Sequence, residues 1–180
     1  MGVVPLSPQP DQSQTADGLY LFDLCDYSYS RVALQELESV DFRGLLTGRV
    51  APSALTGTVP DTGRWGDLVG TYSALLFLIS GRVEQVLLDS QISGWRSVPV
   101  QVLPSGPSEL KLLQVTGRCG PISAGPRGVG QRVERDSFTP TDMWVPDESA
   151  AIVVSKRCAI ALADARLVNV EVRPAGIELE

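Results

Sequence analysis

Two stretches of the sequence decide the expected fold: LISGRVEQVLLDSQISGWRSVPV (residues 78–100) and VVSKRCAIALADARLVNVEVRPA (residues 153–175). They coincide without a gap when the chain is shifted by 75 positions. The matching pairs include Ser80 with Ser155, Arg82 with Arg157, Leu87 with Leu162, Asp89 with Asp164, Gly94 with Asn169, and Pro99 with Pro174. This pattern indicates an internal repeat.

Each copy has the features of a strand–helix–strand unit. A short apolar run, LLFLI at 75–79 or AAIVV at 150–154, is typical of a buried strand. The serine that follows is suited to cap a helix, because its hydroxyl can accept a hydrogen bond from a free backbone N–H of the first turn. Gly94 or Asn169, both tolerant of left-handed backbone, is then placed to end the helix. The apolar face of the helix is expected from Val83, Val86 and Leu87 in the first copy and from Cys158, Ala161 and Leu162 in the second.

The sequence therefore predicts an α+β fold. We expect a single domain at residues 18–180, with two pseudo-repeated strand–helix–strand units, near 75–103 and 150–178, on a mostly antiparallel or mixed sheet. Two copies are too few for a solenoid, which needs about three, whereas 180 residues suffice for one domain with its own core. Residues 1–17 are rich in Pro, Gln and Ser, and we expect a flexible N-terminal tail there.

Further signals along the chain are weaker. Pro99 favours a sheet edge for the strand that contains it, because proline has no N–H to donate. RVALQELE (residues 31–38) has the apolar spacing of a short helix, and residues 47–70 and 117–130 are broken by Gly and Pro, which predicts loop or irregular structure. Strands are expected at LYLFDL (19–24), WRSVPVQVL (95–103), LKLLQV (110–115) and residues 131–138.

Net charge narrows the class of partner. The formal net charge of −6 disfavours nucleic acid, since binding to the phosphate backbone draws on clustered Lys and Arg. A small basic group keeps that alternative open; it consists of Arg118, Arg127, Arg132 and Arg135. Acidity suits a basic protein partner, and it also keeps a protein in solution.

The location of the protein is expected to be cytoplasmic. No apolar run reaches ~18 residues, so no membrane span is expected, and residues 1–16 lack the basic start and apolar core of a signal peptide. The three cysteines, Cys25, Cys119 and Cys158, are widely spaced and form no CxxC pair. This pattern favours a reducing compartment over a disulfide framework.

The sequence contains no histidine, which removes the most common general base and metal ligand. Ser-His-Asp and Cys-His mechanisms are thereby excluded, whereas chemistry based on carboxylates or Lys stays open. The stretch GPRGVG (residues 125–130) lacks the spacing of a phosphate-binding loop, and Cys119 has no base to activate its thiol. We therefore expect no enzymatic activity, no cofactor and no metal.

The remaining polar and aromatic residues allow two interpretations each. Arg82 and Arg157 either contact an anion or partner, or tie their helices to a nearby carboxylate or carbonyl, and we favour the second. Trp65 and Trp144 lie in loop-like acidic surroundings and either anchor a partner or cap the core from outside. The candidate partner-binding residues are Trp65, Asp67, Asp142, Trp144, Asp147 and Glu148.

The order of segments resembles a known family. It runs through LISGRVEQVL, SGWRSVPVQV, LKLLQVTGRCGPI, TDMWVPDESAAIVVSKRCAIAL and LVNVEVRPAG. Over residues 68–178 this order is similar to the double-CxxCG motif family and, more loosely, to related immunity proteins of bacterial polymorphic toxin systems. The resemblance implies an immunity protein, which binds and neutralises a cognate protein toxin by surface occlusion in the bacterial cytoplasm.

One departure from the family pattern bears on the metal. The two CxxCG motifs suggest a small zinc site and should fall between Ile122 and Phe138, where this chain has no cysteine. The protein either lost that site or descends from a relative that never had it, so no metal ligand is carried over. Two other functions stay open: a structural or regulatory subunit of a larger protein assembly, and an enzyme that works without histidine. The sequence leaves the oligomeric state open.

Overall fold

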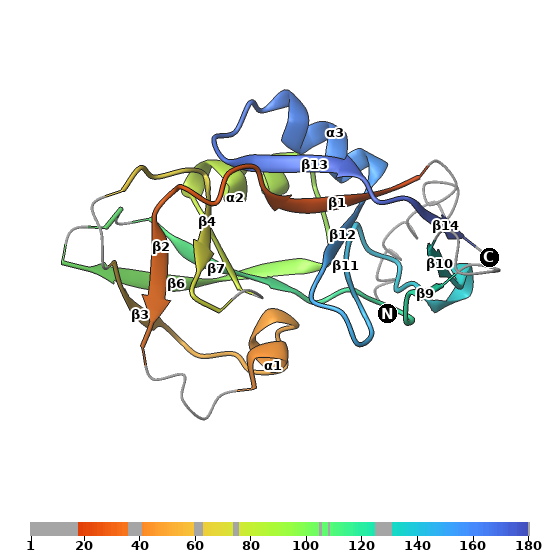
Figure 1. Ribbon diagram of the computed structural model, residues 1–180, viewed down its shortest axis with the longest axis horizontal. Helices are drawn as coiled ribbons and strands as arrows, with labels where there is room; N and C mark the ends of the chain where they lie inside the picture. The colour runs from red at the N-terminus through yellow and green to blue at the C-terminus, as the bar shows by residue number, and fades with distance from the viewer. Residues whose placement is uncertain are drawn as a thin grey trace, which may run out of the picture.

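The computed structural model describes residues 18–35, 41–59, 63–73, 76–104, 106–107, 109–124 and 131–179 (Figure 1). They form a mixed α+β domain that is mostly sheet. The N-terminal tail expected at residues 1–17 lies outside the described residues.

One half of the molecule is a closed barrel with the strand order β2-β3-β6-β7-β5-β4. Its pairs are mixed: β2 with β4 and β3 with β6 run parallel, and the others run antiparallel. The strands are β2 (Arg31–Leu34), β3 (Leu55–Thr58), β4 (Leu68–Thr71), β5 (Phe77–Ile79), β6 (Trp95–Leu103) and β7 (Lys111–Val115).

The other half contains a five-stranded sheet of order β13-β1-β12-β11-β8 and a three-stranded sheet of order β14-β10-β9. β1 lies between β12 and β13 and pairs antiparallel with both, so the first strand of the chain joins strands from its end. The strands are β1 (Leu19–Leu24), β8 (Arg118–Cys119), β9 (Ser123–Ala124), β10 (Gln131–Val133), β11 (Met143–Pro146), β12 (Ile152–Ser155), β13 (Val170–Pro174) and β14 (Ile177–Leu179).

Helices α2 (Gly81–Asp89) and α3 (Lys156–Asp164) lie together on one side of the sheets, and α1 (Phe42–Leu46) lies on the other side (Figure 1). The expected serine caps are confirmed. The Ser80 hydroxyl accepts from the Val83 N–H at 3.4 Å, and the Ser155 hydroxyl accepts from the Cys158 N–H at 3.2 Å. A short 3-10 helix, η3 (Arg135–Ser137), follows β10.

A single large apolar cluster joins the two halves. It contains side chains from the barrel, such as Leu78 and Leu112, and from the other sheet, such as Phe22 and Ile152. Leu45 and Leu46 of α1 belong to it as well, and both are almost fully buried. A smaller cluster, around Trp144, lies beneath β10 and β14. Burial of apolar area on this scale supplies most of the stabilisation of such a domain.

The expectation of a short helix at residues 31–38 is wrong where the structure describes it. Residues 31–34 form strand β2, in which Val32 is fully buried between β3 and β4. A four-residue stretch gains more from pairing on both sides than from one isolated helical turn, so tertiary context overrides the local pattern. Residues 36–38 lie outside the described part of the chain.

Two further expectations are corrected. β6 is not an edge strand, because the barrel closes and β6 lies between β3 and β7. Pro99 fits there because the register of β3 with β6 begins only at Val100. The strand expected over residues 131–138 ends at Val133, where the 3-10 helix takes over.

Candidate protein-binding pocket

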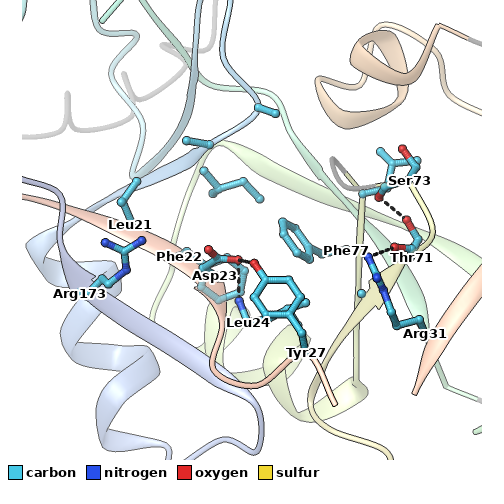
Figure 2. Close-up of a pocket in the computed structure, with 15 residues that line it drawn as sticks. Leu21, Phe22, Asp23, Leu24, Tyr27, Arg31, Thr71, Ser73, Phe77 and Arg173 are labelled. Atoms are coloured by element: carbon cyan, nitrogen blue, oxygen red, sulfur yellow. Dashed lines mark hydrogen bonds between the residues drawn. The ribbon is translucent and has the colours of Figure 1, made fainter. Parts of the chain in front are cut away.

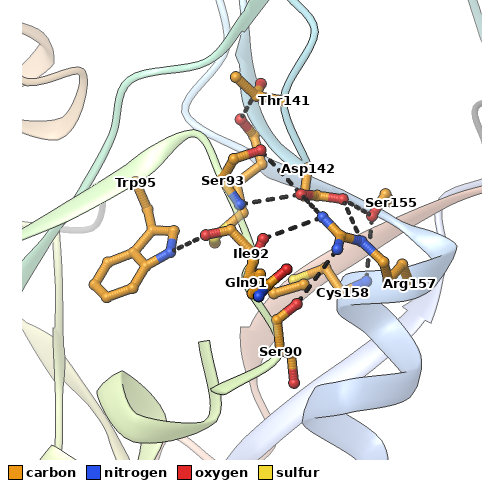
Figure 3. A network of polar contacts seen from close by, with 11 residues as sticks. Ser90, Gln91, Ile92, Ser93, Trp95, Thr141, Asp142, Ser155, Arg157 and Cys158 are labelled. Carbon is orange, nitrogen blue, oxygen red and sulfur yellow. Dashed lines mark hydrogen bonds and ion pairs between the residues drawn. The ribbon is translucent and has the colours of Figure 1, made fainter. Parts of the chain in front are cut away.

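Asp142 lies at the centre of a buried polar network (Figure 3). Its Oδ1 accepts from the Ser155 hydroxyl at 2.9 Å and from Arg157 Nε at 3.2 Å. Its Oδ2 accepts from the Ser93 N–H at 3.0 Å, from the Ser93 hydroxyl at 2.9 Å and from Arg157 Nη2. Arg157 also donates to the carbonyl of Gln91, in the turn after α2. This carboxylate therefore ties α3 to the end of the α2 segment.

Asp67 has a similar set of partners 75 positions earlier in the sequence. It accepts from the Ser80 hydroxyl at 2.7 Å, from Arg82 Nη1 at 2.9 Å and from the Val168 N–H at 2.8 Å. Arg82 donates in addition to the carbonyl of Ala165, after α3. Asp67 thus ties α2 to the end of the α3 segment, in the direction opposite to Asp142.

These contacts give the two arginines the structural role that the sequence favoured, since each binds its helix to a carboxylate. Burial of the Asp142 carboxyl opposes its ionisation. The hydrogen bonds from Arg157, Ser93 and Ser155 outweigh that effect and lower its pKa below the usual value. Asp67 and Asp142 are only 6% and 4% exposed, so neither carboxylate faces a partner as the protein stands.

The four other predicted contact residues lie in three places. Trp144 is 1% exposed and donates its ring N–H to the Thr139 carbonyl, so the expectation that it lies on the surface is wrong. Its indole fills the small cluster beneath β10, edge-on to Phe138. Trp65 is half-buried against the main core. Asp147 and Glu148 are exposed in the loop between β11 and β12, and Asp147 lies 3.9 Å from Arg43 of the α1 segment.

The cysteine thiols are unpaired, and two of them are buried. Burial, with a contribution from Asp147, raises the pKa of Cys119 to about 12, and burial also raises that of Cys158. Thiols with raised pKa values are poor nucleophiles, because the thiolate is the reactive form. Of the small basic group, Arg132 pairs with Glu178 at 3.3 Å, and Arg127 lies outside the described residues.

A pocket of about 320 Å³ opens between the two halves of the molecule, beside β1 (Figure 2). We name it the β1 pocket. Its floor is apolar and contains Leu21, Leu24, Leu76, Phe77 and Ile152, and its rim carries Asp23, Tyr27, Arg31, Ser73 and Arg173. The volume is at the lower end of the range for ligand pockets, about 300–1,000 Å³. It therefore suits a few side chains of a partner better than a large cofactor.

Arg31 and Arg173 lie on opposite sides of this pocket, with the ring of Tyr27 between them (Figure 2). Arg31 Nη2 donates to the Thr71 carbonyl at 3.0 Å. Its Nε is buried and has no hydrogen-bond partner among the described residues. Arg173 is exposed and has Glu171 3.6 Å away. The rim thus carries two cations and one carboxylate, Asp23, which accepts from the Tyr27 hydroxyl at 3.3 Å.

Tyrosine and arginine gather around the same opening. Tyr27 and Tyr72 are 61% and 55% exposed, and the guanidinium of Arg31 lies over the Tyr72 ring at 5.4 Å. Nearby, Arg64 lies over the ring of Tyr29 at 5.0 Å. Of these tyrosines, Tyr27 lines the pocket and Tyr72 contacts Arg31 of its rim. Tyr and Arg are enriched at the energetic centres of protein interfaces, so this face has the composition of a protein-binding surface.

The sequence did not predict this surface, because the aromatic candidates for partner binding were tryptophans in loop-like acidic surroundings. The signal that could have found it is YSYSR (residues 27–31), in which two aromatic side chains and an arginine follow a strand directly. Their link to Tyr72 could not be read from the sequence, because it depends on the parallel pairing of β2 with β4.

No helix in the described ranges is long and apolar enough to cross a membrane. The described residues also contain no group of three or more Cys, Asp or Glu side chains placed to hold a metal ion. No protein-family model matches the chain, and no curated protein sequence matches it.

Proposed function

We propose that the protein binds another protein through the β1 pocket and the tyrosines around it, and that it is an immunity protein that neutralises a cognate bacterial toxin by occlusion. The observation that carries this proposal is the pocket itself, with its apolar floor, two arginines and the exposed Tyr27, together with the exposed Tyr72 that Arg31 contacts. Such a surface can bury aromatic area at low entropic cost and pair with charges on the partner. The toxin as the partner rests on the family resemblance of residues 68–178.

A cytoplasmic location belongs to this proposal. The unpaired, exposed thiol of Cys25 supports it, because exposed thiols persist in a reducing compartment. The exposed Asp147 and Glu148 stay candidates for contact with a basic partner, at a second position near α1.

The test is co-expression with the product of the adjacent upstream reading frame, scored by cell growth and by co-purification. We expect growth arrest by the neighbour alone and relief by this protein. Tyr27→Ala combined with Tyr72→Ala should abolish relief. Leu88→Ala combined with Ile160→Ala, which also removes exposed apolar area but from α2 and α3, should preserve it. A neighbour without toxicity contradicts the immunity function, and relief that survives the tyrosine changes contradicts the β1 pocket as the binding surface.

A second function, as a subunit of a larger assembly, is favoured by the helix face. Leu88 and Ile160 are 56% and 51% exposed on α2 and α3, which pack together on one side of the sheets. Constitutive co-purification with a partner that is not a toxin, lost in the Leu88→Ala and Ile160→Ala protein, would support this function over immunity.

We also infer that the chain consists of two copies of one unit, one ending with β6 and one ending with β13. Three kinds of observation support it. The carboxylates Asp67 and Asp142 bind equivalent Ser and Arg residues. β4 pairs with β5 in the register in which β11 pairs with β12. Gln91 and Arg166, again 75 positions apart, both have positive φ, at 53° and 47°.

A further inference from the structure

If the chain consists of two copies of one unit, the β1 pocket in one copy corresponds to a site in the other copy that the segment around α1 covers. β7 lies between β5 and β6, as β1 lies between β12 and β13. In these pairings Gln114 is opposite Arg96, and Asp23 is opposite Glu171, which is 75 positions after Arg96. Gln114 on β7 and Asp23 on β1 are therefore equivalent positions.

At the β7 position, the segment around α1 covers the strand. The side-chain amide of Gln114, fully buried, donates to the Leu45 carbonyl at 2.6 Å and to the Val50 carbonyl at 2.8 Å. Arg43 donates to the carbonyls of Pro146 and Ser149 in the loop between β11 and β12, at 2.8 and 2.6 Å. One short helical turn is thus held by a strand on one side and by a loop on the other.

At the β1 position, the equivalent groups line the open pocket. Asp23 replaces Gln114 and is half-exposed, and Leu21 is half-exposed where the equivalent Leu112 is fully buried. Thr71 corresponds to Pro146, and its carbonyl is on the rim. The linkers at corresponding places in the two units also differ in length. Twenty residues (35–54) connect the antiparallel pair β2 and β3, whereas six residues (125–130) connect the antiparallel pair β9 and β10.

We propose that the β1 pocket receives a short helical turn from the partner protein, which lies against β1 as α1 lies against β7. The turn presents two adjacent aliphatic side chains, equivalent to Leu45 and Leu46, and at least one carboxylate. The aliphatic pair covers Leu21, which is half-buried, and Phe77, which is 9% exposed, and it removes their remaining apolar area from water. The carboxylate pairs with the exposed Arg173 or with the guanidinium of Arg31 on the opposite side of the pocket (Figure 2). This inference rests on the proposed protein-binding function.

The test uses the full-length protein and two synthetic peptides. The first has the sequence of residues 41–50, DFRGLLTGRV, and the second carries Arg43→Glu and Arg49→Glu, which exchange its cations for carboxylates. Binding is followed by the backbone amide signals of the labelled protein in NMR titrations. We expect saturable shifts on β1 and on the residues beside Leu76, with the acidic peptide binding about fivefold more tightly than the basic one. Leu45→Ser with Leu46→Ser in the acidic peptide should abolish the shifts.

Two protein variants locate the site. Tyr27→Ala should weaken the acidic peptide about tenfold or more. Arg173→Glu changes an exposed side chain, and it should remove the tighter binding of the acidic peptide relative to the basic one. Ile160→Ala on α3 is the matched control and should leave both titrations unchanged. Shifts centred away from β1, or equal binding of the serine-substituted peptide, would overturn the proposal. So would shifts that appear only after removal of residues 1–17, because the chain would then occupy its own pocket.

The co-expression assay separates this inference from the function on which it rests. Growth relief that survives Tyr27→Ala and Arg173→Glu, together with an absence of peptide binding, overturns the pocket but leaves toxin neutralisation standing. If the peptide binds at β1 but the product of the neighbouring reading frame is not toxic, the β1 pocket stands as a binding site for a helical turn. The proposal that its partner is a toxin is then overturned.

Discussion

The carboxylates Asp67 and Asp142 lie 75 positions apart and each accepts from a helix-capping serine and an arginine, yet Asp142 accepts more hydrogen bonds. Arg157 binds both oxygens of Asp142, whereas Arg82 binds Asp67 through one nitrogen. Ser93 offers Asp142 a hydroxyl as well as its N–H, and at the equivalent position Val168 offers only its N–H. The arginine side chains are 41% exposed at Asp142 and 60% exposed at Asp67.

This difference shows how the same local motif can be strengthened by its surroundings. In both networks the serine and arginine come from the helix that follows the carboxylate, so that part is set locally. The third partner comes from the other strand–helix–strand segment and differs between the two. A buried ion pair stabilises the fold only when the remaining lone pairs and protons of its charged groups are also hydrogen-bonded. Asp142 comes closer to that condition than Asp67, because it accepts more hydrogen bonds.

The largest expected effect is the loss of either carboxylate. Asp142→Ala should lower the free energy of unfolding by about 3 kcal/mol and Asp67→Ala by about 2 kcal/mol, because each leaves buried donors without an acceptor. Urea denaturation of the two variants beside the wild type measures the difference. Equal losses, or a larger loss at Asp67, would show that the extra contacts of Asp142 contribute nothing.

Acid should remove the contribution of Asp142 to stability, because the pKa of this carboxyl is lowered in the folded protein. Its stabilising contribution is complete above the unfolded carboxyl value of about 3.9. That contribution is lost as the pH falls through the lower folded value. The free-energy difference between wild type and Asp142→Asn should therefore shrink by about 1–2 kcal/mol between pH 6 and the acid limit of folding.

Urea denaturation across this pH range measures the shrinkage, with Asp164→Asn at an exposed carboxylate as the matched control. A difference that stays constant in acid would mean that ionisation of Asp142 does not stabilise the fold.

The smallest expected effect concerns the third partner. Ser93→Ala removes one hydroxyl donor from Asp142 while its N–H contact remains, and should cost about 1 kcal/mol. Val168→Ser introduces the hydroxyl at the equivalent position beside Asp67, on a side chain that is 42% exposed, and should change stability by less than about 0.5 kcal/mol. Thermal or urea unfolding of both proteins gives the two values, and a reversed order would break the comparison.

The local elements of this protein follow from short patterns in its sequence. The strand at Leu19–Leu24, the strand at Trp95–Leu103 and the two serine-capped helices followed from apolar runs and capping residues, and the structure has them. The tie between each arginine and a carboxylate was also foreseeable, although the identity of the carboxylate was not. These features depend on residues near one another in the chain, where hydrogen bonding and periodicity act directly.

The position of the candidate site, in contrast, depends on contacts between segments that are far apart in the chain. Trp144 looked like a surface anchor and is buried, because β10 and β14 cover it, and residues 31–34 looked helical but became a strand between two others. The β1 pocket depends on β1 joining β12 and β13, more than 120 positions away in the chain, beside β4 and β5 of the barrel. Such pairing is set by the burial of many apolar side chains at once, which no local pattern of residues encodes.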